Sequence, residues 1–475
     1  MKVRTDEFKA RSTETTQNPR RQASLKMVYD GLHKSRIAAA EDTDNWDDLR
    51  DRARAIKWHT INNLDYYLDQ LDQNVRANGG KVYFANDDAE ARDYVLGVAK
   101  ANNVKTVIKS KSMVSEEIGL NEAFEEAGIN PVETDLGEYI IQLAKEPPYH
   151  LIAPAIHKTR EEISDLIQEV AGGPRQEDPE DLTDTARALL RGEFRKAEMG
   201  VSGVNFAVAE TGSIAIVTNE GNGRMVTSAP RVHVAIVGME KVIPSQQDLS
   251  TMLRVLIRSA TGQRISSYVT VVNGPRKAPE EDGPDEFHLV IVNNGRENLL
   301  KDEQLREAML CLRCGACLNA CPVYRKAGGH AYGWVYPGPI GAIVTPVMTG
   351  KKAGRDLPFA STLCGACKDA CPVKIELPQL LLRLRSDLSE GKTDPKEKSS
   401  PLAERASIKL WRFGVQSPMR FSLAGKLSSL MMAPLSQQGW VRWLPPPLSG
   451  WTKSREFPRI AGKPFRARFK KKVQR

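Results

Sequence analysis

All seven cysteines of the chain lie in two short runs, and cysteine thiolates are the ligands that hold iron–sulfur clusters. The first run reads CLRCGACLNACP, in which Cys311, Cys314, Cys317 and Cys321 are separated by two, two and three residues. In bacterial ferredoxins this spacing lets three thiolates hold one [4Fe–4S] cluster, while the fourth, followed by proline, binds a second cluster. The run therefore predicts one local cluster and a thiolate, that of Cys321, directed to another.

The second run, STLCGACKDACP, repeats only the back half of this pattern, because Ser361 stands where a first cysteine would stand. If the last cysteine of each run crosses to the other cluster, the two ligand sets are unequal. The first cluster then takes Cys311, Cys314, Cys317 and Cys371, and the second takes Cys321, Cys364 and Cys367. Three outcomes stay open for the fourth corner of the second cluster: a Ser361 alkoxide, a water or partner residue, or a [3Fe–4S] form.

Zinc is the main alternative to iron and sulfide, because paired CxxC motifs also suit tetrahedral zinc. A three-cysteine wrap and two runs that end in Cys-Pro are poor zinc spacing. Disulfides are not favoured, because no cysteine lies outside the two runs to staple a secreted fold. Leu312, Leu318, Val323 and Ile375 flank the runs and would exclude water from a cluster, although ordinary core packing explains them equally well.

The chain that must position these runs has 475 residues, of which 41% are hydrophobic, so two or three folded units are expected. Single cores stop growing near ~250–300 residues. The first 20 residues hold no apolar segment, and no run of ~18 apolar residues occurs, so a cytoplasmic protein is predicted. Of the net charge of +9, residues 401–475 carry +14, from 16 Lys and Arg against Glu404 and Glu456, which leaves −5 elsewhere.

Hydrophobic periodicity divides the first 298 residues into two regions. Apolar residues recur every three to four positions between 20 and 78, which predicts a helical N-terminal arm over 1–79. Residues 80–298 alternate β-branched runs with amphipathic stretches, which predicts an α/β domain around a mainly parallel sheet. The expected strands are 81–85, 106–109, 132–134, 151–153, 205–209, 213–218, 232–237 and 288–292, and the expected helices are 89–102, 120–127, 160–170 and 249–260.

Residues 299–390 are predicted to form a helical ferredoxin-like domain, in which a short helix over 303–309 leads into the first run. A polar linker over 391–401 opens the basic C-terminal region, 391–475, which carries Trp411, Trp440, Trp443 and Trp451 among Lys and Arg residues. That mixture suits docking to an acidic partner or to the inner face of a membrane. Nucleic-acid binding is less favoured, because no recognition motif supports it.

Two glycine-containing segments of the α/β region are candidates for a single anion-binding pocket. One contains Glu210, Thr211 and Gly212, and the other contains Gly221, Gly223 and Arg224 in the sequence EGNGR. Backbone N–H groups and a guanidinium there could bind a carboxylate or phosphate, although tight turns between strands explain the glycines equally well. Polar residues near strand ends, where open sheets build sites but where solvated termini also lie, are not assigned as catalysts: Lys109, Lys111, Asp135, His233 and Glu240.

Long stretches of the chain resemble the lactate utilization protein B family, namely 109–117, 134–140, 205–224, 282–296, 311–342 and 361–375. The resemblance implies an α/β domain similar to the sugar-phosphate isomerase and CoA-transferase superfamily. It also implies a ferredoxin-like domain like those of succinate dehydrogenase and heterodisulfide reductase iron–sulfur subunits. For the cysteines it implies the same crossed assignment, with a serine at 361 as usual for the family.

For function, the resemblance implies the iron–sulfur subunit of a bacterial system that oxidises L-lactate to pyruvate. The implied partners are a cysteine-rich protein like heterodisulfide reductase and a second α/β protein. We therefore expect an electron-transfer component that need not act on lactate itself. Two other classes stay open: a stand-alone hydroxyacid oxidoreductase with its substrate site in the α/β domain, and a redox-sensing nucleic-acid-binding protein that uses the basic tail.

Overall fold

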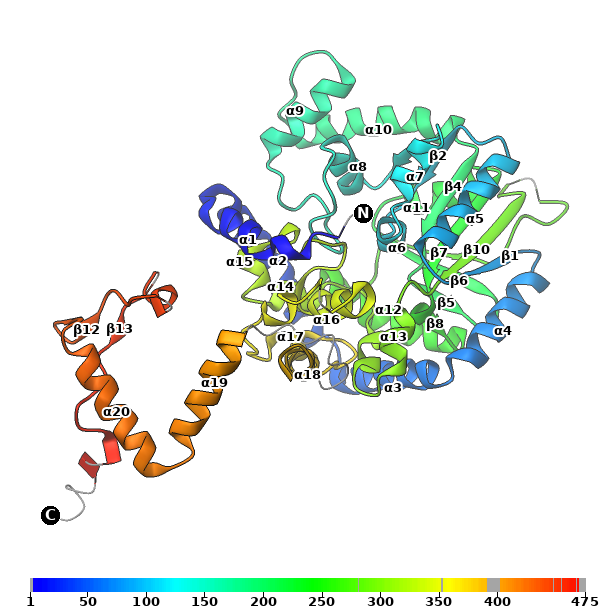
Figure 1. Ribbon diagram of the computed structural model, residues 1–475. Helices are drawn as coiled ribbons and strands as arrows, with labels where there is room; N and C mark the ends of the chain where they lie inside the picture. Colours follow the sequence, from blue (N-terminus) through cyan, green and yellow to red (C-terminus); the bar gives the residue numbers. More distant parts are fainter. Residues whose placement is uncertain are drawn as a thin grey trace. The chain divides into compact units, whose positions relative to one another are not determined.

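Six parallel strands form the central sheet of residues 1–398, the first of two units into which the chain divides (Figure 1). The computed structural model describes residues 3–280, 282–351, 353–390, 402–446, 448–453, 455–466 and 468–469. The sheet has the order β1-β10-β7-β4-β2-β3, and each neighbouring pair runs parallel. Its strands are β1 (Lys81–Ala85), β2 (Thr106–Lys109), β3 (Asn130–Glu133), β4 (Met199–Gly203), β7 (Val232–Gly238) and β10 (Glu286–Val292). This confirms the predicted mixed α/β fold with a parallel sheet.

Both faces of the central sheet are covered, as parallel sheets require. On β7, Val232, Val234 and Ile236 belong to one core cluster, and Ala235 and Val237 belong to another. The core cluster that contains Val232, Val234 and Ile236 also includes residues of α5 and of the segment from α6 to α7, so these helices cover one face of the sheet. These helices are α5 (Asp88–Ala101), α6 (Met113–Glu117) and α7 (Leu120–Glu126). All residues of β7 are therefore buried, because its side chains pack into cores on both faces of the sheet.

Helices precede the sheet, as predicted, and they belong to the same unit as the sheet. The second of them begins where the Asn18 side chain accepts the N–H of Arg21 and Pro19 takes the first helical position. It packs against α12 and α14, so it joins the α/β part to the cysteine-bearing part. The helices named here are α1 (Phe8–Gln17), α2 (Pro19–Glu41), α3 (Trp46–Asn62), α4 (Leu64–Ala77), α12 (Gln246–Thr261) and α14 (Ala316–Ala320).

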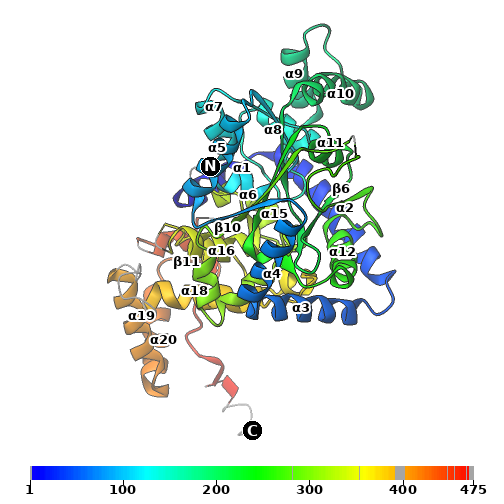
Figure 2. The same ribbon diagram turned by 90° about the vertical axis from the view of Figure 1, so that its right-hand side faces the viewer.

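A second sheet of four strands has the order β8-β5-β6-β9 and shares the larger core with α2 to α4. Its strands are β5 (Phe206–Val208), β6 (Ser213–Thr218), β8 (Val242–Ile243) and β9 (Tyr268–Val272). Three helices pack together as a smaller cluster at one end of the unit, where α9 and α10 lie side by side (Figure 2). They are α8 (Leu136–Leu143), α9 (Arg160–Ala171) and α10 (Pro179–Lys196).

The predicted strand over 151–153 is wrong. His150 Nδ1 accepts the backbone N–H groups of Ile152, at 3.2 Å, and of Ala153, at 3.3 Å. These donors are therefore used inside an irregular turn and are not free to pair with a neighbouring strand. The turn instead contributes to the wall of a cavity.

Of the described strands of this unit, the sequence analysis missed three, β4, β8 and β9. In β4, Gly200 and Gly203 lower the apparent strand propensity. A Cβ at Gly200 would lie 1.9 Å from the carbonyl oxygen of Val226, and a Cβ at Gly203 would lie 2.9 Å from that of Lys111. Both glycines thus permit close packing against segments remote in sequence, which local propensity does not reveal.

Short helices carry the cysteine runs, as predicted for a helical cluster domain. The expected helix over 303–309 is the 3₁₀ helix η3 (Leu305–Leu310). The α helices are α13 (Arg296–Lys301), α14, α15 (Tyr324–Ala327), α16 (Gly338–Thr349), α17 (Ala366–Ala370) and α18 (Leu377–Glu390). The predicted linker over 391–401 lies outside the described residues.

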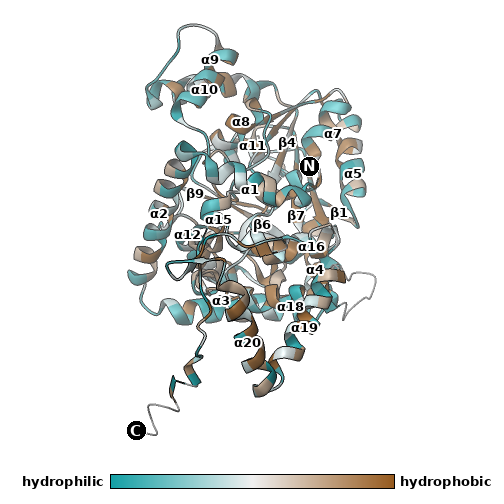
Figure 3. Ribbon diagram, turned by 60° about the vertical axis from the view of Figure 1, so that its left-hand side comes forward, coloured by the Kyte–Doolittle hydropathy of each residue, from teal (hydrophilic) through white to brown (hydrophobic). Residues whose placement is uncertain are grey.

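The described residues of the second unit form two α helices, the 3₁₀ helix η7 (Leu448–Trp451) and three very short strands. Its α helices are α19 (Leu402–Val415) and α20 (Pro418–Met432), and its antiparallel strands are β11 (Ser436–Gln437), β12 (Trp440–Val441) and β13 (Phe457–Pro458). Apolar residues are concentrated along α20 (Figure 3), and large side chains such as Trp411 and Met419 are exposed. In the described parts of the chain, no helix combines the length and apolar character needed to cross a membrane.

Candidate metal centre and adjoining cavity

The two cysteine runs fold into the same backbone motif, fifty residues apart in the sequence. Arg313 and Leu363 both have positive φ, of 61° and 56°, and Gly315 and Gly365 follow with φ of 77° and 89°. Each motif then enters a five-residue helix, α14 or α17, and these two helices pack against each other. The left-handed turns wrap each run tightly, which is how closely spaced thiolates can surround one cluster.

Ser361 occupies the same place in its motif as Cys311 does in the first. The N–H of Arg313 donates to Cys311 Sγ at 3.4 Å, and the N–H of Leu363 donates to Ser361 Oγ at 3.1 Å. The serine oxygen thus points into its turn as the sulfur does. The structure therefore provides an oxygen where the sequence lacks a thiolate.

The four cysteines assigned to the first cluster line one small cavity, together with Leu312 and Ile375. Three come from the first run, and Cys371 comes from the second. The N–H of Ile375 donates to Cys371 Sγ at 3.4 Å, which is the kind of contact that stabilises a bound thiolate. Four thiolates around one enclosed cavity are the ligand set that a [4Fe–4S] cluster requires.

Cys321, Cys364 and Cys367 form the other neighbouring set. The pKa of Cys367 is raised to about 12, mainly by burial and to a smaller extent by the adjacent Cys321 thiolate. Burial also raises the pKa of Cys321, to which the Cys364 thiolate contributes. Cys364 itself is exposed, and hydrogen bonds to its sulfur lower its pKa. The second set therefore opens to the surface at Cys364, whereas the first is almost fully enclosed.

The spacing of the cysteine sulfurs argues against the zinc alternative. Four thiolates on a single zinc ion lie about 3.8 Å apart, because each Zn–S bond is about 2.3 Å long. Among the described residues, the group of three His, Cys, Asp or Glu ligand atoms within 4.8 Å of one another is Glu146, His157 and His330, with no cysteine. A cubane places each thiolate on a different iron, so its thiolates need not approach one another as closely as those on a single zinc ion.

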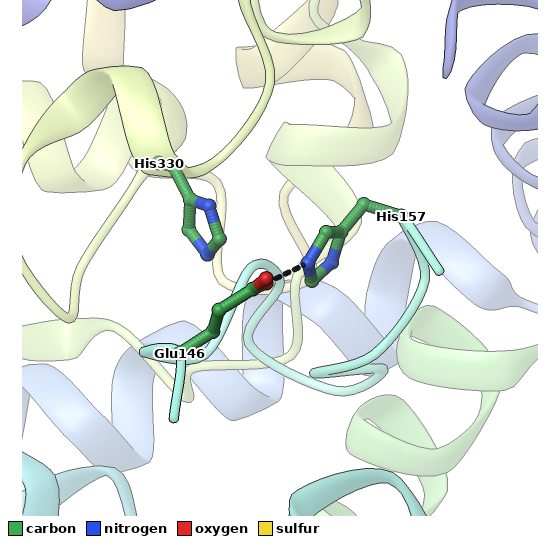
Figure 4. Close-up of side chains that lie close together, drawn as sticks. All are labelled: Glu146, His157 and His330. Atoms are coloured by element: carbon green, nitrogen blue, oxygen red, sulfur yellow. Dashed lines mark hydrogen bonds and ion pairs between the residues drawn. The ribbon is translucent and has the colours of Figure 1, made fainter. Parts of the chain in front are cut away.

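Glu146, His157 and His330 lie close together, and a hydrogen bond joins Glu146 to His157 (Figure 4). Glu146 Oε2 lies 2.6 Å from His157 Nε2, while Oε1 accepts a hydrogen bond of 2.6 Å from Lys158 Nζ. His330 Nε2 donates to the carbonyl oxygen of Pro147 at 2.8 Å, and burial lowers the pKa of His330 to about 4. Because the carboxylate already has a cationic partner, we assign the trio a structural role in joining the 146–158 loop to the cysteine-bearing part.

A cavity of about 530 Å³ lies outside the carboxyl ends of the central strands. Its lining includes Lys111 after β2, Asp135 after β3 and Asn205 after β4. Arg313 and Cys314, from the first cysteine run, belong to the same lining and also line the cavity of the first cysteine set. The α/β sheet and the candidate metal centre therefore share a wall.

Of the polar residues that the sequence placed near strand ends, Lys111, Asp135 and Glu240 line this cavity. Lys109 does not, since it is buried in hydrogen bonds to Glu133, at 2.5 Å, and Asn121, at 2.6 Å. His233 also lies elsewhere, with its Nε2 2.8 Å from Ser202 Oγ. The first three thus belong to a concave site, and the other two are structural.

The structure does not bring the two predicted anion-binding segments together. They lie at opposite ends of β6, about 20 Å apart for six extended residues. Glu210 and Gly212 belong to a turn against α4, where Asn74 Nδ2 donates to the carbonyl oxygens of Ala209 and Glu210. Gly221 precedes the short helix α11 (Asn222–Ser228), on which Arg224 is exposed. From these segments only Glu220 and Asn222 line the cavity.

Sequence reasoning missed the cations around the first cysteine set. Lys241 Nζ donates to the carbonyl oxygen of Leu312 at 2.9 Å, and Lys57 Nζ donates to that of Glu240. The Arg313 guanidinium lies 4.2 Å from the centre of the Tyr336 ring. Burial lowers the pKa of Lys57 to about 7 and of Lys241 to about 8, against the opposing effect of nearby carboxylate and thiolate charges. Of these cations, only Arg313 lies within the CLRC motif, so it is the one whose position near the cysteines the sequence itself indicates.

Glu220 provides a pH-dependent test of the cavity wall. Burial and the neighbouring Asp135 raise the pKa of Glu220 to about 7. In the unfolded chain the Glu220 carboxyl ionises at a lower pH than in the folded protein. The free energy of unfolding should therefore fall as the pH rises from about 4.5 to 7, and Glu220 should cause no further change above that range. We expect Glu220→Gln to gain about 1–2 kcal/mol in free energy of unfolding at pH 8 relative to pH 5, after allowance for solvent screening. Urea denaturation at both pH values measures this, and an equal effect at both would contradict it.

Three family models together match most of the chain. Residues 68–292 match the family model of the LUD domain, residues 307–375 that of a 4Fe–4S dicluster domain, and residues 382–474 that of the C-terminal region of lactate utilisation protein B. The dicluster match spans every cysteine, which confirms the predicted iron–sulfur binding. A DUF162 family protein of known structure from Deinococcus radiodurans matches 48% of this chain and 98% of its own, at 11% identity and a TM-score of 0.27.

Three curated relatives, all named Lactate utilization protein B, match nearly end to end. The Bacillus licheniformis protein is 44% identical over 459 residues, which cover 96% of this chain and 95% of its own. Those of Bacillus velezensis and Bacillus subtilis are 43% identical over 471 residues, which cover 99% of this chain and 98% and 96% of theirs. With this identity over almost its whole length, the chain belongs to the lactate utilization protein B family.

Proposed function

We propose that the chain is the iron–sulfur electron-transfer subunit of a complex that oxidises L-lactate to pyruvate. The observation that carries this is the pairing of α14 with α17, which gathers all seven cysteines into two adjoining sets. The Cys367 thiolate of the second set lies close enough to Cys317 of the first set to raise the pKa of Cys317, after the larger effect of burial. Iron–sulfur clusters bound there accept and release single electrons. The name of the relatives supports lactate as the origin of the electrons.

The proposed ligands are Cys311, Cys314, Cys317 and Cys371 for a [4Fe–4S] cluster, and Cys321, Cys364 and Cys367 for a second cluster. Ser361 Oγ is our candidate for the fourth ligand of the second, because it repeats the position of Cys311 Sγ in the matching turn. Burial of the first set keeps a partner protein away from it. The exposed Cys364 makes the second site the edge at which a partner protein can approach.

The proposed partners are a cysteine-rich protein like heterodisulfide reductase and a second α/β protein. The unit that begins at residue 399 supports docking, because exposed apolar side chains, including Trp411 and Trp443, lie among Lys and Arg. An acidic partner or a membrane surface would be attracted by that charge. If so, docking should weaken as salt increases, because mobile ions screen exposed charges.

The cavity favours one second candidate, a stand-alone hydroxyacid oxidoreductase. Full-length protein, with clusters reconstituted anaerobically, would be mixed with L-lactate or D-lactate and an artificial electron acceptor. We expect no lactate oxidation from this chain alone. Added partner subunits should permit lactate-dependent reduction of its clusters, measured by electron paramagnetic resonance, at a rate that falls with salt. Oxidation without partners would overturn the electron-transfer proposal in favour of the second candidate.

A further inference from the structure

The cavity lies at the topological switch point of the central sheet. From β2 the chain proceeds to β3 on one side, whereas β4, β7 and β10 are placed in succession on the other. Open α/β sheets bind ligands outside the carboxyl ends of the strands at such a point. Lys111 and Ser112 after β2, and Val204 and Asn205 after β4, all line the cavity. Its position is therefore that of a ligand site.

The size and walls of the cavity suit an organic molecule. Its volume of about 530 Å³ falls within the range of about 300–1,000 Å³ that small-molecule sites occupy. Apolar side chains, among them Ile152, Ile216 and Leu256, form part of the lining. A three-carbon acid would leave much of this volume to water, so a ligand with an apolar portion fits as well.

Two buried cationic side chains in the cavity wall have donor atoms without a hydrogen-bond partner, although carboxylates lie near both. Among the described residues, Lys111 Nζ and the Nε and Nη1 atoms of Arg313 have no hydrogen-bond partner. The other guanidinium nitrogen of Arg313 lies 3.6 Å from Glu240 Oε1. A buried charged donor without an acceptor is costly, and an anionic group would supply the acceptors. Asp135 and Glu220 also line the cavity, and these carboxyl groups favour a ligand that offers hydroxyl donors.

We propose that this cavity binds a hydroxylated organic anion, with its anionic group on the unpartnered cations and its hydroxyl groups facing Asp135 and Glu220. The ligand would lie against the first cysteine run, because Arg313 and Cys314 line both cavities. This deepens the proposed function by placing a small molecule beside the first cluster, and it rests on that function. Two sources share this chemistry: a small hydroxycarboxylate such as lactate, and a larger hydroxylated phosphate such as flavin mononucleotide.

Equilibrium binding to the full-length, cluster-loaded protein tests the proposal, with L-lactate and flavin mononucleotide as separate probes. We expect one of them to bind saturably at one molecule per chain and to shift the paramagnetic resonance spectrum of the first cluster. Lys111→Met should weaken that binding at least about tenfold, as loss of a buried charged hydrogen bond does. Ala260→Phe, which keeps every charge but fills part of the cavity, should weaken it as well.

Lys100→Met is the matched control, since Lys100 is exposed on α5 and does not line the cavity. It should bind the probe as the parent protein does. Failure of both probes to bind, or equal binding by the parent, Lys111→Met and Ala260→Phe proteins, would overturn the inference. If the clusters load and take up electrons while no probe binds, only this inference fails. If a probe binds but the clusters take up no electrons, the proposed function fails instead.

Discussion

The Cys371→Ala variant is expected to lose the first cluster, although Cys371 belongs to the second cysteine run. The reason is the crossing of the chain: Cys371 lines the same small cavity as Cys311, Cys314 and Cys317. Removing one of four thiolates should cost the cluster an iron or the whole cluster, because no other thiolate reaches that corner. Iron and sulfide analysis with paramagnetic resonance spectroscopy of the anaerobic protein would show the first signal lost and the second retained.

Cys364→Ala is the matched control, because it changes the same residue type in the same run but belongs to the other set. It should remove the second signal and retain the first. Cys321→Ala tests the crossing in the opposite direction and should also remove the second signal, although Cys321 lies in the first run. If Cys371→Ala and Cys364→Ala damaged the same cluster, each run would serve its own cluster, and the crossed assignment would be rejected.

Much of the fold was predictable because its signals are local. The strands over 81–85, 106–109 and 213–218 were placed correctly, since β-branched runs bounded by turn residues are sufficient to identify them. The strand expected at 151–153 failed because a side chain, His150, competes for the backbone donors. β4 was missed because its glycines serve contacts with α11 and the Lys111 segment, which no local window contains.

The candidate site likewise has one part that local sequence predicts and another that depends on the assembled fold. Cysteine spacing alone indicated iron–sulfur binding and the unequal ligand sets, because the loops that wrap a cluster are short. The cavity could not be predicted, since it forms where the ends of β2 and β4 meet a run more than 100 residues further along the chain. Lys111 was noticed only as a strand-end residue. That its amine is buried without a partner is a property of the assembled structure.

Arg296→Met is expected to destabilise the protein by about 3–5 kcal/mol, as loss of one partner from a buried ion pair does. Arg296 is completely buried, and its Nη1 and Nη2 atoms each donate to Glu117 at 2.8 Å. Its Nε donates to Glu240 at 2.7 Å. The variant would leave two buried carboxylates without this cation, at the contact between the α/β part and Tyr336 of the cysteine-bearing part. Urea denaturation followed by tryptophan fluorescence measures the loss.

Two further variants separate the loss of charge pairing from the loss of packing. Arg175→Met removes an exposed arginine that pairs with Asp165, and it should leave the denaturation midpoint close to that of the parent. Adding Glu117→Gln and Glu240→Gln to Arg296→Met should recover part of the stability, because neither carboxylate that paired with Arg296 then carries a charge, and the recovery is only partial because Arg313 loses its contact with Glu240. Recovery would show that Arg296 matters mainly because it neutralises Glu117 and Glu240, and so holds the wall between the sheet and the first cysteine run in place. A triple variant no more stable than Arg296→Met would attribute the loss to packing.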